Sequence, residues 1–322
     1  MRIFADADYP FLEWRRRAYV VSALLLLAGI GGMIFNVASL GAWLNYGVDF
    51  SGGTMVQVRF EEQVTIDQVR AVDPGGWQIT RFGEPEESEF IIRMQTFEES
   101  LGADPAEQVI SSLSEQFGPE TFQVVRTEAV GPTVGNELQT RALYAILISF
   151  VLTLIYLAFR FEWRFGVAAV IATAHDILIT LGFIALLRME ISVATVAAFL
   201  TIVGYSLNDT IVVFDRVREN LANRKRGVEY ADIIDRSINE TLPRTVLTSG
   251  TTLATLGSLY LFGGAVIRDF ALVLIMGIAI GTFSSIFVAS PALAAIERKW
   301  PRAATRPRAG SGAKRKREPA SV

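Results

Sequence analysis

The sequence contains no cysteine and only one histidine, His175, and this scarcity excludes several kinds of chemistry. Without cysteine there is no disulfide framework, thiolate zinc site, iron–sulfur cluster or catalytic thiol, although the absence does not identify the redox compartment. One histidine excludes metal motifs that need two, and no glycine-rich Walker loop is present to hold a nucleotide phosphate. The segments between apolar runs also lack a nucleophile–base set. We therefore expect that the protein is not an enzyme and that it has no cofactor or metal ion.

The charges fall into two opposite populations, which the formal net charge of −3 conceals. Residues 45–137 hold 17 acidic and 5 basic side chains, whereas the rest of the 322 residues hold 16 acidic and 25 basic ones. Hydrophobic residues make up 51% of the chain. This combination is typical of a membrane protein with one acidic domain outside the bilayer.

Long apolar runs predict a polytopic α-helical membrane protein, because about 20 apolar residues are needed for a helix to cross a bilayer. We predict six transmembrane helices, over residues 18–40, 138–160, 165–187, 191–214, 244–262 and 265–296. The first run is too long for the core of a cleaved signal peptide, so we expect it to remain as an anchor.

The distribution of Lys and Arg predicts how these helices are oriented. It assigns the N-terminal residues 1–17, the connection 215–243 and the tail 297–322 to the cytoplasm, and residues 41–137 to the opposite side. The tail has a composition typical of disorder. Its basic cluster at 314–317 is either a solvated end that fixes topology or a site for anionic lipid or ribosomal RNA.

Residues 41–137 are long enough for one small domain, which we call the head. Patterns of strand, helix, strand, strand, helix and strand predict a ferredoxin-like α+β fold. The predicted strands are 54–60, 77–82, 90–95 and 121–129, and the predicted helices are 64–72 and 105–117. The acidic surface of the head is either simply solvated or engages unfolded polypeptide, and composition does not distinguish the two.

Two glycine-rich segments flank the head and predict tight turns or hinges where it meets the membrane helices. The residues concerned are Gly47, Asp49, Gly52 and Gly53 before the head, and Gly131, Pro132 and Gly135 after it. A rigid joint and a moving one are equally compatible with these residues.

Ionisable residues inside the predicted spans are the strongest functional signal, since they are costly in hydrocarbon and usually mark ion or proton pathways. Asp209 lies among small and polar neighbours, and Arg244 opens the fifth span one turn before Thr248. We predict that Arg244 pairs with Asp209 when the carboxylate is ionised, and that His175 and Asp176 contribute to a proton relay. The alternatives are a structural carboxylate, a topology-fixing arginine and a His–Asp pair that braces helix packing.

Several motifs together resemble the SecD/SecF family of bacterial protein-export membrane proteins, within the RND superfamily. They are Gly-Val-Asp-Phe-Ser-Gly-Gly at 47–53, Val-Gly-Pro-Thr-Val-Gly at 130–135, His175-Asp176, Gly-Tyr-Ser-Leu-Asn-Asp-Thr at 204–210, and Pro243-Arg244-Thr245 through Thr248. The resemblance covers residues 15–297 in order. It implies residence in the bacterial inner membrane and proton movement through Asp209, Arg244 and Thr248.

The resemblance also implies partners. It implies a heterodimer with a separate SecD chain that works beside the SecYEG channel and YajC, after SecA has driven insertion of the preprotein. Protons, preprotein and membrane lipids are then the expected ligands, with no nucleic acid. The other functions that we consider are an RND-type exporter of small molecules or lipids and a non-transporting scaffold or holdase of the translocon.

Overall fold

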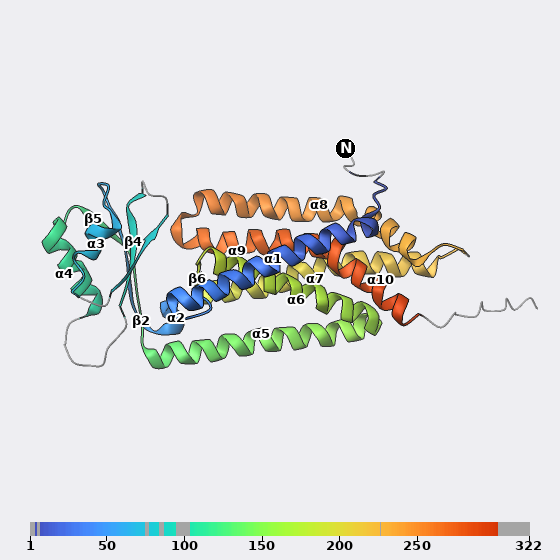
Figure 1. Ribbon diagram of the computed structural model, residues 1–322, viewed down its shortest axis with the longest axis horizontal. Coiled ribbons are helices and arrows are strands. Elements are labelled where there is room, and N and C mark those ends of the chain that lie inside the picture. The colour runs from blue at the N-terminus through green and yellow to red at the C-terminus, as the bar shows by residue number, and fades with distance from the viewer. Residues whose placement is uncertain are drawn as a thin grey trace, which may run out of the picture.

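A bundle of long helices carries a small sheet domain at one end (Figure 1). The computed structural model describes residues 4, 7–74, 77–83, 87–94, 104–225 and 227–301. The bundle helices are α1 (Phe11–Leu40), α5 (Pro132–Arg160), α6 (Trp163–Leu186), α7 (Val193–Ala222), α8 (Tyr230–Phe262), α9 (Gly264–Ser284) and α10 (Ser290–Lys299). A π-helical segment, η2 (Ser285–Ala289), joins α9 to α10 without a break.

Five helices in the described part of the chain are long and apolar enough to cross a membrane. They correspond to α1, α5, α6 and α7 and to the continuous run from Ile267 to Lys299. The remaining predicted span, 244–262, forms the second half of α8, which is long enough but less hydrophobic. Its many threonine and serine side chains lower its hydropathy, and the hydroxyls of Thr251, Thr255 and Ser258 bond back to carbonyls of the same helix.

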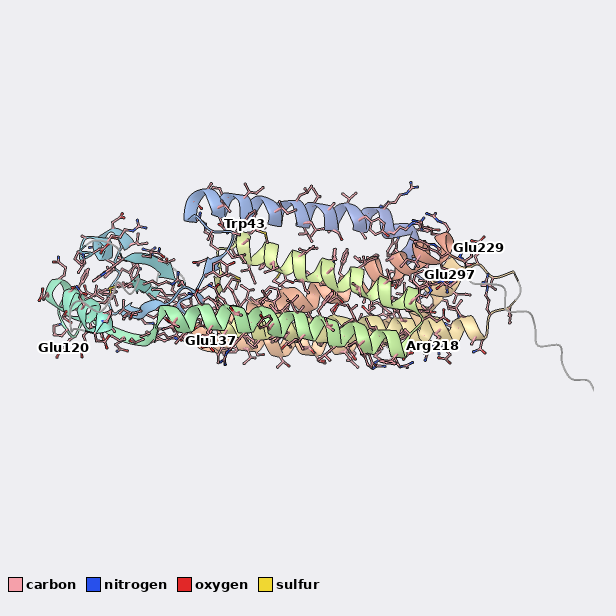
Figure 2. All side chains as sticks on the ribbon, turned by 90° about the horizontal axis from the view of Figure 1, so that it is seen from below. Trp43, Glu120, Glu137, Arg218, Glu229 and Glu297 are labelled. Carbon is pink, nitrogen blue, oxygen red and sulfur yellow. The ribbon has the colours of Figure 1, made fainter. Side chains whose placement is uncertain are left out.

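Helices α7 and α8 continue beyond the predicted spans, so most of the connection 215–243 is helical and only residues 223–229 join the two. Figure 2 shows Trp43 and Glu137 at the end of the bundle next to the head, and Arg218, Glu229 and Glu297 at the far end. Residues 302–322 of the predicted basic tail lie outside the described residues.

Small residues allow two pairs of helices, α1 with α6 and α7 with α9, to pack closely. A Cβ at Gly29 of α1 would lie 2.6 Å from the Cα of Gly182 of α6, so these two backbones touch. On α9, a Cβ at Gly277 would overlap the side chain of Ile202 of α7, and one at Gly281 would lie 3.1 Å from the Cβ of Ser206. Helices α7 and α9 are therefore in close contact at the level where the buried carboxylates occur.

The head contains a four-stranded antiparallel sheet in the order β3-β4-β2-β5. Its elements are β2 (Gly53–Phe60), α3 (Ile66–Arg70), β3 (Gln78–Phe82), β4 (Glu89–Met94), α4 (Pro105–Phe117) and β5 (Phe122–Val130). Helix α3 is shorter than the predicted 64–72 because Thr65 forms a capping box with Gln68, which fixes its first turn. Position 95, the predicted end of the third strand, lies outside the described residues.

A short parallel pair and one helical turn connect the head to the bundle. β1 (Asn45–Tyr46) pairs with β6 (Glu190–Ile191), which lies between α6 and α7. The turn α2 (Val48–Ser51) follows β1 after one residue, Gly47, and leads into β2. The chain between α1 and the sheet is thus fixed against the loop between α6 and α7.

Candidate functional site

Asp209 lies in the interior of the bundle with only 2% of its surface exposed. It belongs to α7, and the Ser249 hydroxyl of α8 donates a hydrogen bond of 3.2 Å to its Oδ2. The Thr282 hydroxyl of α9 in turn donates to Ser249 Oγ over 2.8 Å. Three helices therefore meet at this carboxylate through hydroxyl groups.

Asp176 of α6 is buried more completely, at 1% exposure, and is the centre of a second cluster. Its Oδ2 accepts hydrogen bonds from Ser206 Oγ of α7 at 2.5 Å and from Ser284 Oγ of α9 at 2.7 Å. Its Oδ1 lies 2.9 Å from Nδ1 of His175. The carboxylate is thus saturated by short hydrogen bonds, which is how a buried charge or acid is tolerated in an apolar interior.

His175 extends this second cluster to α1, because its Nε2 lies 3.0 Å from the Ser22 hydroxyl. A neutral imidazole that donates from Nδ1 to Asp176 accepts at Nε2 from Ser22. The two neighbours therefore serve different partners, as expected for side chains about 100° apart on a helix. A continuous set of hydrogen bonds joins α1, α6, α7 and α9.

The two clusters lie one turn apart, since Ser206 and Asp209 are three residues apart on α7 and share a face. On α9, Thr282 serves the Asp209 cluster and Ser284 the Asp176 cluster. Among the described residues, no Lys or Arg forms an ion pair with either carboxylate. The interior of the bundle therefore holds two acidic groups whose nearest partners are hydroxyls and one imidazole.

Arg244 and Thr248 do not hydrogen-bond to Asp209 in this structure, and their pairing with an ionised Asp209 stays a prediction. The predicted ion pair between Arg244 and Asp209 is not formed in this structure, and Ser249 occupies the position beside the carboxylate. Five residues turn an α-helix by about 140° and advance it by about 7.5 Å, so Arg244 projects from another face of α8 than Ser249 does. Thr248 Oγ1 donates to the carbonyls of Arg244 and Thr245 at 3.0 and 3.1 Å within its own helix.

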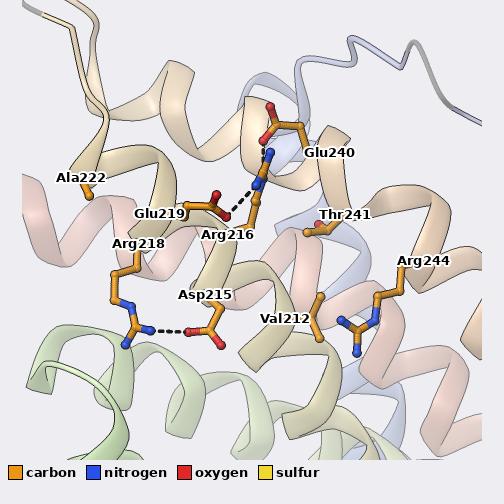
Figure 3. Close-up of a pocket in the computed structure, with 9 residues that line it drawn as sticks. All are labelled: Val212, Asp215, Arg216, Arg218, Glu219, Ala222, Glu240, Thr241 and Arg244. Atoms are coloured by element: carbon orange, nitrogen blue, oxygen red, sulfur yellow. Dashed lines mark hydrogen bonds and ion pairs between the residues drawn. The ribbon is translucent and has the colours of Figure 1, made fainter.

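Arg244 instead lines a pocket of about 610 Å³ at the end of the bundle far from the head (Figure 3). The lining residues come from α7 and α8, and Val212 is the one nearest to the middle of α7. Asp209 lies three residues, or about one turn, further into the bundle than Val212. The pocket thus ends close to the first buried carboxylate, with Arg244 on its wall.

An ion-pair network at the mouth of this pocket was not predicted from the sequence. Glu240 accepts hydrogen bonds from Arg216 at 2.6 Å, Asn220 at 2.7 Å and Arg236 at 2.8 Å. Partial burial alone would raise the pKa of Glu240, but these hydrogen bonds outweigh it and lower the pKa to about 2. The spacing of Arg236 and Glu240, four apart on one helix, was a signal available in the sequence.

A second ion-pair group closes the same end of the bundle. Asp215 of α7 accepts a hydrogen bond of 2.8 Å from Arg160 at the end of α5 and pairs with Arg218 at 3.0 Å. Figure 3 shows the Arg218–Asp215 contact beside the pocket. The Arg160–Asp215 pair connects α5 to α7, and the Arg218–Asp215 pair lies within α7.

The first glycine motif forms the joint between head and bundle. Asp49 Oδ2 accepts a hydrogen bond of 2.8 Å from the backbone N–H of Val193, the first residue of α7. A side chain at Gly47 would overlap Glu190, and Gly52 and Gly53 have φ values of 71° and 115° that favour glycine. These residues therefore set the path of the chain into β2.

The second glycine motif starts α5 and packs on the first. Gly131 is the N-cap of α5, and Pro132 is its first residue, a position where the missing N–H costs nothing. A Cβ at Gly135 would lie 3.0 Å from both Phe50 O and Gly52 N, so α5 approaches α2 backbone to backbone. Gln139 Nε2 also donates to Phe50 O over 2.7 Å.

The described residues hold no group of three or more His, Asp or Glu side chains arranged to bind a metal ion. The arrangement can instead hold, donate or accept protons at carboxylates and hydroxyls in a membrane-embedded position. Fold and site together define a multi-pass membrane protein with an extramembrane sheet domain and a buried acidic centre.

Comparison with known proteins assigns the family within that class. Residues 109–299 match the family described as protein export membrane protein SecD/SecF, C-terminal, and residues 37–64 match the SecD/SecF GG motif. The chain therefore belongs to the SecD/SecF family.

Relatives and a solved structure agree with this assignment. The chain is 47% identical to protein translocase subunit SecF of Gemmatimonas aurantiaca, over 94% of this chain and 91% of that one. It is 40% identical to the same subunit of Escherichia coli O157:H7, over 88% and 86% of the two chains. The crystal structure of SecDF, a translocon-associated membrane protein from Thermus, is similar with a TM-score of 0.80 and 38% identity. That match covers 92% of this chain and 40% of the SecDF chain.

Proposed function

We propose that the chain is a subunit of the Sec protein-export machinery that uses the proton-motive force to assist preprotein translocation. Similarity to subunits named SecF over about nine-tenths of their length supports this function. The match to 40% of the SecDF chain supports SecD as the proposed partner. The SecYEG channel and YajC are the proposed neighbours, and the pair acts after SecA has driven insertion.

We further propose six transmembrane helices in the bacterial inner membrane, with both termini in the cytoplasm and the head in the periplasm. The length of α8 and its contacts with both α7 and α9 support it as the sixth span, despite its hydroxyl-rich sequence. The sheet order β3-β4-β2-β5, with α3 and α4 in the two crossovers, supports a ferredoxin-like head.

The observation that carries the proton-coupling proposal is the burial of Asp209 at 2% exposure with hydroxyls as its contacts. A hydroxyl donates to a carboxylate and equally well accepts from a carboxylic acid, so both protonation states of Asp209 can be satisfied without breaking the packing. Such a group can load and release a proton. A guanidinium fixed against it would instead hold it ionised.

In this proposal Arg244 and Thr248 act only while Asp209 is ionised. Arg244 lies on the wall of the pocket that ends about one turn from Asp209. We propose that its guanidinium approaches Asp209 when the carboxylate ionises and retreats into the pocket on protonation. Thr248, one turn further along the same face, would then provide a hydroxyl along that path.

His175 and Asp176 form the second proposed station of the relay. Their hydrogen bonds connect α6 with α1, α7 and α9, so a change of protonation at this pair affects the packing of four helices. One charge that crosses 100 mV releases about 2.3 kcal/mol, so a few protons are enough to drive a helix rearrangement. The joint between head and bundle would transmit that rearrangement to the head. Its residues are Gly47, Asp49, Gly52, Gly53, Gly131, Pro132 and Gly135.

Proton flux into proteoliposomes tests the relay. The chain is reconstituted with its SecD partner, SecYEG and SecA, and a pH-sensitive dye inside the vesicles reports flux during translocation of a preprotein. Asp209→Asn should abolish the translocation-dependent flux, whereas Asp215→Asn should preserve it, because Asp215 lies at the end of the bundle in ion pairs with Arg160 and Arg218. Flux that is unchanged in Asp209→Asn would remove the basis for the relay.

A further inference from the structure

A cleft of about 700 Å³ lies where the head meets the bundle, and it is separate from the buried carboxylates. One side is formed by the head, through α3, β3 and β4. The other side is formed by the end of α1, the segment that follows it, and Arg188 just beyond α6. The cleft therefore joins the two parts of the molecule.

The charge of this cleft is opposite to that of the domain that forms it. Arg70, Arg81, Arg93 and Arg188 line it, and its other described lining residues include no Asp or Glu. Three of these arginines belong to the acidic segment 45–137, which has only 5 basic residues against 17 acidic ones. Most of the positive charge of the head therefore lies in this cleft, whose low-dielectric walls strengthen the attraction for an anion.

The arginines of the cleft are held in place but only partly compensated. Arg93 is ion-paired with Glu190 and bonded to Asn45, and this contact fixes its position. The Nε atoms of Arg81 and Arg93 are buried and have no hydrogen-bond partner among the described residues. Buried donors of this kind are normally satisfied, and within the described part of the chain these two guanidinium N–H groups have room for a further acceptor.

Arg188 supplies the membrane side of the cleft without a carboxylate partner in the described part of the chain. Its guanidinium donates to Ser39 Oγ over 2.6 Å and lies 5.2 Å from the centroid of the Phe35 ring. Both contacts orient the side chain while leaving its charge in place. Arg81 likewise has no ion pair in that part, so two of the arginines that line the cleft, Arg81 and Arg188, have no carboxylate partner among the described residues.

The level of the cleft identifies the anion. Ser39 is the next-to-last residue of α1, and Arg188 follows the end of α6 by two residues, so both lie where spanning helices leave the hydrocarbon. Phe35 and Trp43 are each 62% exposed at this level, as is typical of aromatic side chains at a membrane interface. The anions that are fixed at this depth are the phosphodiesters of lipid headgroups.

We propose that this cleft binds the headgroup phosphodiester of an anionic phospholipid from the leaflet on the head side. Arg81 and Arg188 are its principal ligands, since a guanidinium matches a phosphate with two parallel hydrogen bonds. Trp77 and Tyr46 line the same cleft and contribute apolar and hydroxyl contacts to the glycerol portion. A lipid bound there holds the head against the bundle, independently of the proton relay.

Native mass spectrometry of the full chain in detergent tests the site, with short-chain phosphatidylglycerol and phosphatidylcholine as probes. The wild-type chain should retain phosphatidylglycerol preferentially, and Arg81→Gln with Arg188→Gln should reduce this retention about tenfold. Arg141→Gln is the matched control, because Arg141 lies near the head-side start of α5, is paired with Glu137 and does not line the cleft. It should change retention less than about twofold.

Two further experiments distinguish lipid phosphate from free phosphate and control for misfolding of the double variant. Millimolar inorganic phosphate should fail to displace the lipid, and complete displacement would overturn the lipid assignment in favour of free phosphate. Arg188→Gln alone changes an exposed side chain and should fold, so a loss of preference in this variant supports the site. Equal retention of phosphatidylglycerol in all variants, or equal retention of the two lipids by the wild type, would overturn the proposal.

Discussion

Ser249 of α8 donates a hydrogen bond of 3.2 Å to Asp209 of α7, and this hydroxyl lies where the sequence indicated the guanidinium of Arg244. The difference changes the chemistry of the site. A serine hydroxyl serves both the ionised and the protonated carboxyl, whereas a paired arginine favours only the ionised one. Asp209 is therefore buried beside a group that can satisfy the carboxyl in either protonation state.

Removal of the Ser249 hydroxyl should impair proton coupling more than it impairs folding. Ser249→Ala deletes one hydrogen bond to Asp209 and should cost about 1–2 kcal/mol of unfolding free energy. Translocation-dependent proton flux should fall with it. Ser258→Ala is the control, since the Ser258 hydroxyl donates to the Ala254 carbonyl of its own helix and not to Asp209. Equal flux in both variants would contradict a role for Ser249.

The two hydroxyls on Asp176 should act as a coupled pair. Ser206→Ala and Ser284→Ala each remove a short hydrogen bond to Oδ2 and should each destabilise the chain by about 1–3 kcal/mol. Because both bond to one atom, the double variant should deviate from additivity by at least about 0.5 kcal/mol. Unfolding in mixed micelles measures this cycle, and strict additivity would show that the two contacts are independent.

The contact between Gly29 and Gly182 should not tolerate a methyl group. Gly182→Ala puts a Cβ 2.7 Å from the Cα of Gly29 and forces α1 away from α6, at a cost of about 1–3 kcal/mol. Gly31→Ala on α1 meets no atom within 4 Å, so it should be neutral or slightly stabilising. The unfolding midpoints of the two variants in detergent measure the difference. Similar midpoints would mean that the helices are not in backbone contact.

Glu240 should make stability depend on acid pH. Its folded-state pKa of about 2 lies below the ordinary value of 4.5, so its stabilising contribution is present above pH 4.5 and is lost as pH falls towards 2. Glu240→Gln should cost roughly 1 kcal/mol at pH 7, because water screens a network at the bundle end. The difference in unfolding free energy between this variant and the wild type should disappear as the pH falls from 4.5 to 2. Glu115→Gln, an exposed change in α4, should leave no such difference.

Secondary structure was predictable from the sequence wherever one strong local pattern dominated. The helix at 105–117 agrees with α4 to the residue, because Asp104 accepts from Ala106 N–H at its start and Gly118 follows its end. The helix at 64–72 was predicted too long, because hydrophobic spacing continues past the point where the chain turns. The segment 244–262 is long enough to span a bilayer, but its many hydroxyls lower its hydropathy, so length and hydropathy give different predictions there.

The contacts within the candidate site were less predictable, because they depend on how helices distant in sequence are rotated. Asp176, Asp209 and His175 were identified by the cost of ionisable groups in hydrocarbon, which a sequence does reveal. Their partners Ser206, Ser284 and Ser22 come from three other helices, and no local spacing indicates them. Opposite charge and the family resemblance suggested Arg244 as the partner of an ionised Asp209, whereas in this structure the hydroxyl of Ser249 contacts Asp209.

The central claim is that protonation of Asp209 couples the proton-motive force to export, and the most direct test is the export rate with and without that force. Vesicles that contain the chain, SecD, SecYEG and SecA translocate a preprotein with or without an imposed proton gradient. The account predicts that the gradient accelerates export with the wild type and Asp215→Asn but has no effect with Asp209→Asn. Undiminished acceleration by the gradient in Asp209→Asn would contradict it.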